Sequence, residues 1–197
     1  SGEPGFVNQQ AASKRRDNFN TVNPCGEILL DSNGLCNLTT VNIMSFVKDD
    51  ATLDMSGLLR AMWLSARAAL RMTCLELELE RWDTIQKRDR LLGCSITGWQ
   101  DAMNAIGMGA ADQARLLRTL REAVHAAGTG YAKELGITSP LLMTTVKPEG
   151  TLSQLPGVSS GVHFSHSPYY IRRVRISADD DNRELDQECA NGICPVR

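Results

Sequence analysis

Residues 23–27, with the sequence NPCGE, place a carboxamide, a thiol and a carboxylate within five positions. A proline and a glycine bracket Cys25, which favours a tight loop that presents the thiol at its tip. The Glu27 carboxylate could take a proton, the Asn23 amide could orient a hydroxyl group, and the sulfur could exchange an electron, a hydrogen atom or an acyl group. From spacing alone, a buried loop cysteine beside a solvated glutamate is the more common arrangement, so the motif needs support from the rest of the chain.

Three further cysteines lie within the first hundred residues. Cys36 follows Cys25 by eleven positions, and the two thiols could meet if the chain doubles back between them. The alternative is a core cysteine on a strand, since free cysteine is among the most buried residue types. Cys74 lies in a helical pattern and Cys94 in a glycine-flanked segment, and we expect both to pack in the interior.

The last two cysteines, Cys189 and Cys194, lie near the C-terminus beyond an acidic stretch. Their neighbours cannot supply a hydrophobic core, so we expect residues 178–197 to form a flexible tail. Two exposed thiols at this spacing could close a disulfide and reopen it by exchange, as a redox shuttle requires. The competing interpretation is half of a zinc site, but the tail offers no histidine, and we predict no metal site.

A possible anion-binding turn follows an apolar run at residues 141–146. A glycine-containing turn that leads into a hydroxyl-rich segment can expose backbone N–H groups to an anion, although the glycine, lysine and threonine spacing is not that of a P-loop. His163 and His166, in the loop beyond, are expected to be ordinary surface residues. The candidate anion-binding residues are Pro148, Glu149, Gly150, Thr151, Leu152 and Ser153.

Composition limits the class of protein that could carry these groups. The 197 residues are 42% hydrophobic and 22% charged, with a net charge of −2, which excludes dominant disorder and argues against a dedicated nucleic-acid binder. No apolar run approaches the roughly 18 residues that cross a bilayer, and the first residues show no signal-peptide pattern. We therefore expect a cytoplasmic protein with reduced cysteines and no membrane contact.

The elements that position these groups are expected to alternate between helix and strand. Long helices separated by short apolar strands indicate an α/β architecture. Helical periodicity predicts helices at 58–77, 99–105 and 111–135, the first capped by Asp54 or Ser56 and the last ended by Gly136. Strands are expected within 35–47, at 141–146 and at 169–176, with a short helix or connector at 85–92 and a turn at 93–98.

Taken in order, these stretches resemble the ribonucleotide reductases. The resemblance is carried by NPCGE at 23–27, CNL at 36–38, KRDR at 87–90, PEGT at 148–151, YYIRR at 169–173 and the terminal cysteine pair before Pro195. The form of the first motif is similar to the class II, adenosylcobalamin-dependent enzymes, and most of all to the monomeric ribonucleoside-triphosphate reductases. The resemblance runs from the start of the chain to about residue 176 and resumes at the tail.

The resemblance implies a fold. Residues 1–177 would form the second half of a ten-stranded α/β barrel, with Cys25 on the finger loop inside it. Residues 178–197 would form the flexible dithiol tail.

The resemblance also implies a radical mechanism. Breakage of the carbon–cobalt bond of adenosylcobalamin would turn Cys25 into a thiyl radical that abstracts the 3′ hydrogen of the ribose. Glu27 would accept the 3′-hydroxyl proton and Asn23 would bind the ribose hydroxyls, while the 2′-hydroxyl leaves as water. Cys36 would be one of two thiols that supply the reducing equivalents. Residues 148–153 would bind the phosphates of a ribonucleoside triphosphate, and Cys189 and Cys194 would pass electrons from thioredoxin.

The chain departs from the family pattern in its length. Family members are several times longer, and the upstream barrel half that carries the partner of Cys36 is missing here. We therefore expect a fragment, an internally deleted product or one piece of a split enzyme that works with a second chain and is inactive alone. The alternative from another class is a non-catalytic thiol–disulfide exchange module that works through Cys189 and Cys194.

Overall fold

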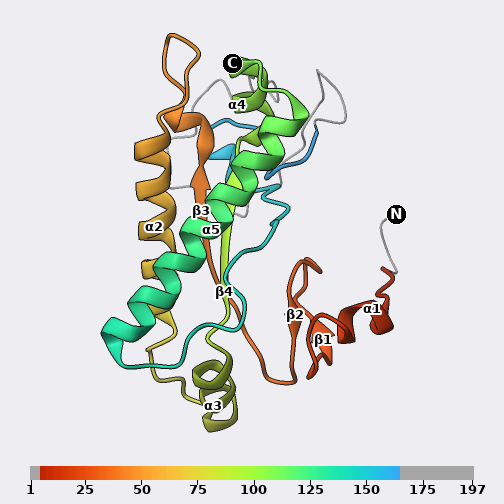
Figure 1. Cartoon of the computed structure of the whole chain (residues 1–197). Coiled ribbons are helices and arrows are strands. Elements are labelled where there is room, and N and C mark those ends of the chain that lie inside the picture. Colours follow the sequence, from red (N-terminus) through yellow and green to blue (C-terminus); the bar gives the residue numbers. More distant parts are fainter. Residues whose placement is uncertain (1–4, 165–197) are drawn as a thin grey trace, which may run out of the picture.

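A computed structural model describes residues 5–164 of the chain (Figure 1). The predicted strand at 169–176, His166, the cysteine pair and the proposed boundary at residue 177 lie outside the described residues. In chain order the elements are α1 (Gln9–Ser13), β1 (Thr21–Val22), β2 (Leu29–Leu30), β3 (Asn37–Asn42), the 3₁₀ turn η1 (Ile43–Phe46), α2 (Met55–Met72), α3 (Glu80–Asp89), β4 (Leu92–Thr97), α4 (Trp99–Ile106), α5 (Ala110–Leu135) and the 3₁₀ turn η2 (Leu152–Gln154).

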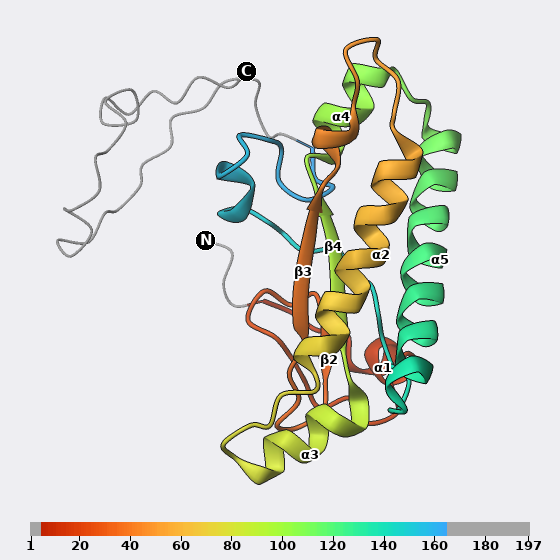
Figure 2. The same cartoon turned by 90° about the vertical axis from the view of Figure 1, so that its left-hand side faces the viewer.

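The centre of the fold is a parallel pair of strands, β3 and β4. They pair in register over six positions, from Asn37 opposite Leu92 to Asn42 opposite Thr97. Two parallel strands need a crossover connection, and here α2 and α3 supply it. Figure 1 and Figure 2 show α2 and α5 side by side, both lying against the strand pair. This is the helix-on-sheet arrangement expected for an α/β protein.

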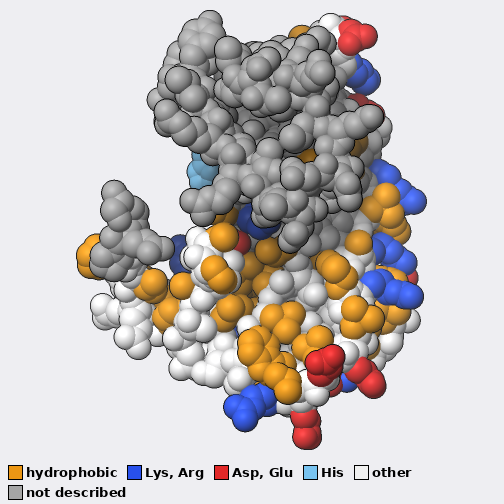
Figure 3. Space-filling model, turned by 180° about the vertical axis from the view of Figure 1, so that it is seen from behind, with side chains coloured by type: hydrophobic (Ala, Val, Ile, Leu, Met, Phe, Trp, Pro, Cys, Tyr) orange, Lys and Arg blue, Asp and Glu red, His pale blue; other side chains and the backbone are white. Residues whose placement is uncertain are grey.

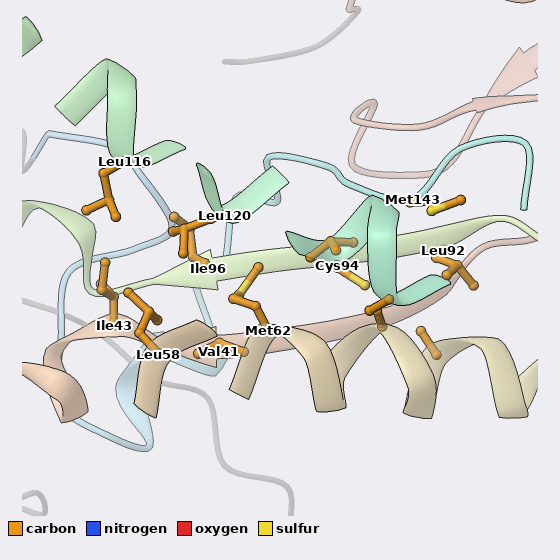
Figure 4. Close-up of a cluster of buried hydrophobic side chains, with 14 of the residues drawn as sticks. Val41, Ile43, Leu58, Met62, Leu92, Cys94, Ile96, Leu116, Leu120 and Met143 are labelled. Carbon is orange, nitrogen blue, oxygen red and sulfur yellow. The ribbon is translucent and has the colours of Figure 1, made fainter. Parts of the chain in front are cut away.

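The hydrophobic core lies between this strand pair and the two long helices. Figure 4 shows Leu58 and Met62 of α2 pointing toward the strands, with Leu116 and Leu120 of α5 on the other side of the cluster. Val41 and Ile96 supply the strand side of the same cluster. The side chain of Leu58 is fully buried, and such burial contributes on the order of 1.5–3 kcal/mol per large aliphatic side chain.

The three predicted helices are confirmed, with changed boundaries. The first begins at Met55 because Asp54 caps it, its Oδ1 accepting the backbone N–H of Gly57 at 3.0 Å. It ends at Met72, five residues before the predicted end. The helices at 99–106 and 110–135 match the expected spans closely, and Gly136 ends the longer one in the left-handed conformation, with φ 66°.

Residues 93–98, predicted as a turn, belong mainly to a strand. The turn prediction is wrong because residues 92–97 form β4, and all six of them are buried. Gly93 is required there by close packing: a Cβ atom at this position would lie 2.2 Å from Leu38 Cδ2. The strand predicted within 35–47 is confirmed as β3. The segment at 85–92, predicted as a short helix or a connector, contains the end of α3 and the start of β4.

Residues 141–146 do not form the predicted buried strand. They run beside β4 and make a single bridge, between Thr144 and Cys94. Three backbone hydrogen bonds follow the same edge, including Leu92 N to Leu142 O at 2.9 Å and Thr145 N to Cys94 O at 3.1 Å. Leu141 and Val146 are exposed, so only the middle of the segment is buried.

The N-terminal hairpin of β1 and β2 lies across β3 and β4 from α2 (Figure 1). An ion-pair network fixes it to the end of α3. The buried Arg16 guanidinium pairs with the buried Asp89 carboxylate and donates to the Leu29 carbonyl, and Arg88 pairs with Asp31 at 2.7 Å. A buried ion pair is costly to break from one side, so this network fixes where the hairpin sits.

Within residues 5–164 the strands form two separate two-stranded sheets, and no closed barrel. The outer edge of β3 has no strand partner among these residues. Figure 3 shows apolar side chains gathered near α3, where Leu75, Leu79 and Trp82 are exposed. No helix in the described part of the chain is both long and apolar enough to cross a bilayer.

Candidate active site

The loop between β1 and β2 presents Cys25, as the sequence predicts. The Gly26 N–H donates to the Asn23 carbonyl at 2.8 Å, which closes a tight turn around Cys25. Gly26 adopts a φ of 77°, a conformation that costs glycine little and other residues more. The thiol of Cys25 is exposed at the tip of this turn.

The Asn23 side chain holds the base of the same loop. Its Oδ1 accepts the backbone N–H of Ile28 at 2.9 Å, and the Asn23 N–H donates to the Ile28 carbonyl at 3.3 Å. The carboxamide oxygen is therefore committed to the loop. The amide nitrogen makes no hydrogen bond within residues 5–164, so it remains available to a hydroxyl group.

Thr145 joins the loop to the central strands. Its hydroxyl donates to the Glu27 carbonyl at 3.1 Å, while its backbone N–H donates to the Cys94 carbonyl of β4 at 3.1 Å. Thr145 is not among the site residues predicted from the sequence, although a pair of threonines inside an otherwise apolar run is a visible signal. Thr145 fixes the position of Glu27 relative to the strand pair.

The Glu27 carboxylate is turned inward. Both of its oxygens are buried, and neither has a hydrogen-bond partner within the described part of the chain. Glu27 lines two cavities, of about 380 and about 370 Å³, and Thr144 and Thr145 line both as well. A buried carboxylate without a partner costs free energy, so it is a candidate to bind or deprotonate a ligand.

Cys36 lines the smaller of these cavities together with Glu27. The thiol is half-buried, and burial raises its pKa to about 12, with Cys94 and Glu27 adding to the shift. Gly93 leaves the space that the sulfur needs, since a Cβ atom there would lie 3.0 Å from Cys36 Sγ. Cys36 is therefore a protonated thiol at neutral pH, next to a carboxylate.

The two cysteines expected to pack in the interior have different environments. Cys94 is buried in the core, which confirms the prediction, and burial raises the pKa of its thiol. Cys74 is exposed, which contradicts the prediction, because α2 ends at Met72 and leaves Cys74 in the turn that follows.

The predicted anion-binding turn at 148–153 follows residues 141–146, the segment that runs beside β4. It lies at the carboxyl end of the strands. Gly150, Thr151 and Leu152 are exposed, whereas Ser153 and the Glu149 side chain are buried. The Ser153 N–H donates to the Glu149 carbonyl at 3.1 Å, and the Ser153 and Ser160 hydroxyls share a hydrogen bond of 3.1 Å.

This turn and the Cys25 loop are connected through residues 144–147. Thr145 contacts the loop, and two positions later the Lys147 N–H donates to Ser95 Oγ at 3.2 Å. His163 is exposed, as predicted. Within residues 5–164, no cluster of three or more histidine, cysteine or acidic side chains could hold a metal ion.

Comparison with known proteins identifies the family. Residues 1–139 match the model of the ribonucleotide reductase barrel domain. A candidate adenosylcobalamin-dependent ribonucleoside-triphosphate reductase of Mycobacterium phage D29 is 32% identical over 98% of this chain, and covers it with 29% of its own length. The adenosylcobalamin-dependent ribonucleoside-triphosphate reductase of Lactobacillus helveticus is 30% identical over 91% of this chain and 28% of its own length.

Solved structures of ribonucleotide reductases also superpose on this chain. A B12-dependent, class II ribonucleotide reductase superposes with a TM-score of 0.66 and 28% identity, covering 76% of this chain and 23% of the other. The class Id alpha subunit of Actinobacillus ureae, 18% identical with a TM-score of 0.58, shares the fold over 77% of this chain and 33% of its own. The chain spans about a third or less of the length of the proteins it matches. It belongs to the ribonucleotide reductase family, of whose barrel domain it contains a part.

Proposed function

We propose that this chain takes part in the reduction of ribonucleoside triphosphates to 2′-deoxyribonucleotides by thiyl-radical chemistry, in the cytoplasm. The observation that carries the proposal is the cavity of about 370 Å³ lined by Glu27 and Cys36, next to the loop that exposes Cys25. Family membership supports the same reaction class. The described residues would be part of a ten-stranded barrel, with residues 23–28 as its finger loop.

In the proposed reaction, Cys25 as a thiyl radical abstracts the 3′ hydrogen of the ribose. Glu27 accepts the 3′-hydroxyl proton, for which its buried oxygens are suited because they have no hydrogen-bond partner among residues 5–164. Asn23 donates to a ribose hydroxyl through its amide nitrogen. The 2′-hydroxyl leaves as water, and Cys36 with a second thiol supplies two electrons and two protons as the pair becomes a disulfide. Cys25 regains its radical when the 3′ hydrogen returns to the sugar.

Adenosylcobalamin would supply the radical through homolysis of its carbon–cobalt bond. The residues present fit such a group, because Cys25 is exposed and the space beside Gly26 is open: a Cβ atom there would meet nothing within 4 Å. Cys25 would face the cofactor.

The remaining roles fall to the C-terminal cysteines, which lie outside the described residues, to the turn at 148–153 and to a second chain. Cys189 and Cys194 would reduce the disulfide of Cys36, and thioredoxin or a similar protein would reduce them in turn. Residues 148–153 would hold the substrate phosphates. A second chain carrying the upstream part of the barrel would complete the site, and the isolated chain would be inactive.

The test combines this chain with a separately expressed upstream barrel half from a relative, adenosylcobalamin, a ribonucleoside triphosphate and a dithiol. We expect the two proteins together to produce deoxyribonucleotide and either protein alone to produce none. The upstream half combined with the Cys25→Ser variant of this chain should also produce none. Cys74→Ser, which alters another exposed thiol, is the matched control and should retain turnover. Turnover by the isolated chain would overturn its proposed inactivity. Undiminished turnover in Cys25→Ser would overturn the radical role, and thiol exchange alone through Cys189 and Cys194 would favour the redox module.

A further inference from the structure

A carboxylate lies at the start of the turn to which we assign the substrate phosphates. Glu149 is the second residue of the segment 148–153, and a negative charge facing that side would repel a triphosphate. The Glu149 side chain is instead 0% exposed, beneath the turn rather than on its surface. Its backbone has a φ of 56°, an uncommon conformation for a residue with a side chain. The buried carboxylate therefore needs an explanation.

Its contacts point to β3. The Thr40 hydroxyl donates to Glu149 Oε1 at 2.6 Å, across 109 positions of sequence. The other oxygen, Oε2, is buried without a hydrogen-bond partner among the described residues, and the Lys147 ammonium lies 4.0 Å from it. Hydrogen bonds to ionised groups are about twice as strong as neutral ones. Glu149 thus connects the turn to β3 through one short hydrogen bond, while its other oxygen faces the ammonium of Lys147 in the same segment.

The far end of the same loop has its own attachments. The Ser159 carbonyl accepts the Gly98 N–H at 2.8 Å, the Ser159 N–H donates to Asp101 at 2.6 Å, and the Gly161 N–H donates to the Thr97 hydroxyl at 3.2 Å. These bonds fix residues 159–161 to the end of β4 and the start of α4. At the near end, the Lys147 N–H donates to Ser95 Oγ of β4, and the Glu149 side chain attaches the turn itself to Thr40 of β3.

We propose that Glu149 is a positioning residue that fastens the phosphate-binding turn to Thr40 of β3 and keeps its own carboxylate beneath the turn, beside the Lys147 ammonium. The proposal rests on the proposed function of residues 148–153. With the fastening intact, the exposed Gly150 and Thr151 face outward in a fixed arrangement. Without it, the turn loses its alignment with the strands while the core of α2 and α5 is untouched.

The test uses two substitutions of Thr40 in the full 197-residue chain. Thr40→Val removes the hydroxyl but keeps the shape and suits a strand, whereas Thr40→Ser keeps the hydroxyl and is the matched control. Hydrogen exchange of residues 150–158 should accelerate about tenfold or more in Thr40→Val and stay within about twofold of wild type in Thr40→Ser. Exchange in α5 serves as the internal reference and should not change.

Binding of sodium tripolyphosphate, measured by calorimetry, gives the second measurement. We expect about tenfold weaker binding in Thr40→Val and in Glu149→Ala, and unchanged binding in Thr40→Ser. Unchanged exchange in Thr40→Val would overturn the fastening, and unchanged tripolyphosphate affinity in that variant would overturn the positioning role. If wild type itself fails to bind tripolyphosphate, the proposed phosphate role fails, while the exchange data still decide whether Glu149 fastens the turn.

Discussion

The Thr145 hydroxyl donates to the Glu27 carbonyl at 3.1 Å, across 118 positions of sequence. Through this bond the residue that follows the exposed cysteine loop is held to the segment beside β4. The loop makes its own internal hydrogen bonds, but these alone do not orient it relative to the strands. The ion pairs of Arg16 and Arg88 hold the hairpin below, and Thr145 holds the end of the loop itself.

Thr145→Val should loosen the loop by removing this bond. We expect a loss of about 1 kcal/mol in the stability of the loop and about fivefold faster hydrogen exchange at Gly26 and Ile28, because an ordinary hydrogen bond contributes on that order. Thr145→Ser retains the hydroxyl and should exchange at the wild-type rate. Equal exchange in the valine and serine variants would show that Thr145 does not hold the loop.

Cys36 should react far more slowly with thiol reagents than Cys25 or Cys74. Burial, with the neighbouring Cys94 and Glu27, raises the pKa of Cys36 to about 12, so little thiolate exists at pH 8. In a Cys189→Ser, Cys194→Ser background, alkylation followed by mass spectrometry should find Cys36 labelled at least about a hundredfold more slowly. Its rate should keep rising up to about pH 12, whereas an ordinary thiol levels off above about pH 8.5.

The raised pKa of Cys36 also makes the stability of the folded protein depend on pH. A raised folded-state pKa means that the folded protein holds the Cys36 proton more tightly than the unfolded chain does. The contribution is therefore complete below about pH 9 and is lost as the pH rises toward about 12. Fast labelling of Cys36 at pH 8 in the folded chain would contradict both expectations.

Asp31 should stabilise the hairpin at neutral pH and not in acid. The hydrogen bond from Arg88, with further bonds from Asn20 and Ser32, lowers the pKa of Asp31 to about 2. A lowered folded-state pKa contributes stability above the unfolded value near 4, which is lost as the pH falls toward 2.

Urea unfolding provides the measurement for Asp31. Asp31→Asn should lose about 1 kcal/mol at pH 7, a partly exposed ion pair being screened by solvent, and about zero at pH 2. Asp17→Asn, at an exposed carboxylate without an ion pair in the described residues, is the control and should match wild type at both values. A loss of equal size at both pH values would count against the ion pair.

Gly93→Ala should destabilise the strand pair. The added Cβ atom would lie 2.2 Å from Leu38 Cδ2 and 3.0 Å from Cys36 Sγ, so both side chains must move. We expect a loss of about 1–3 kcal/mol in unfolding free energy and a change in the labelling rate of Cys36. Gly130→Ala, on α5 with open space around the position, is the control and should be neutral or slightly stabilising.

Local patterns in the sequence predict the elements that local physics determines. The helices at 99–106 and 110–135 follow from periodicity, and the exposure of Cys25 follows from the proline and glycine around it. Gly93 is a turn signal when taken alone, so the sequence predicts a turn where the structure has β4. The glycine is there because Leu38 of the neighbouring strand packs against it, a contact that no local pattern contains.

The candidate site divides in the same way. Asn23, Cys25 and Glu27 are neighbours in sequence, so their shared loop could be predicted. The bonds that hold the site join residues more than a hundred positions apart, as in Thr145 to Glu27 and Thr40 to Glu149. Such pairs depend on the register of β3 and β4, which hydrophobic patterning alone does not specify.

Among residues 5–164 the outer edge of β3 has no strand partner, and this has a consequence for the isolated chain in solution. An edge that no other strand covers is a template on which a second chain can add a strand. Concentrated samples of this protein should therefore self-associate through that edge, and dilution should reverse the process. In a larger sheet, a neighbouring strand would pair with this edge of β3 and prevent the self-association.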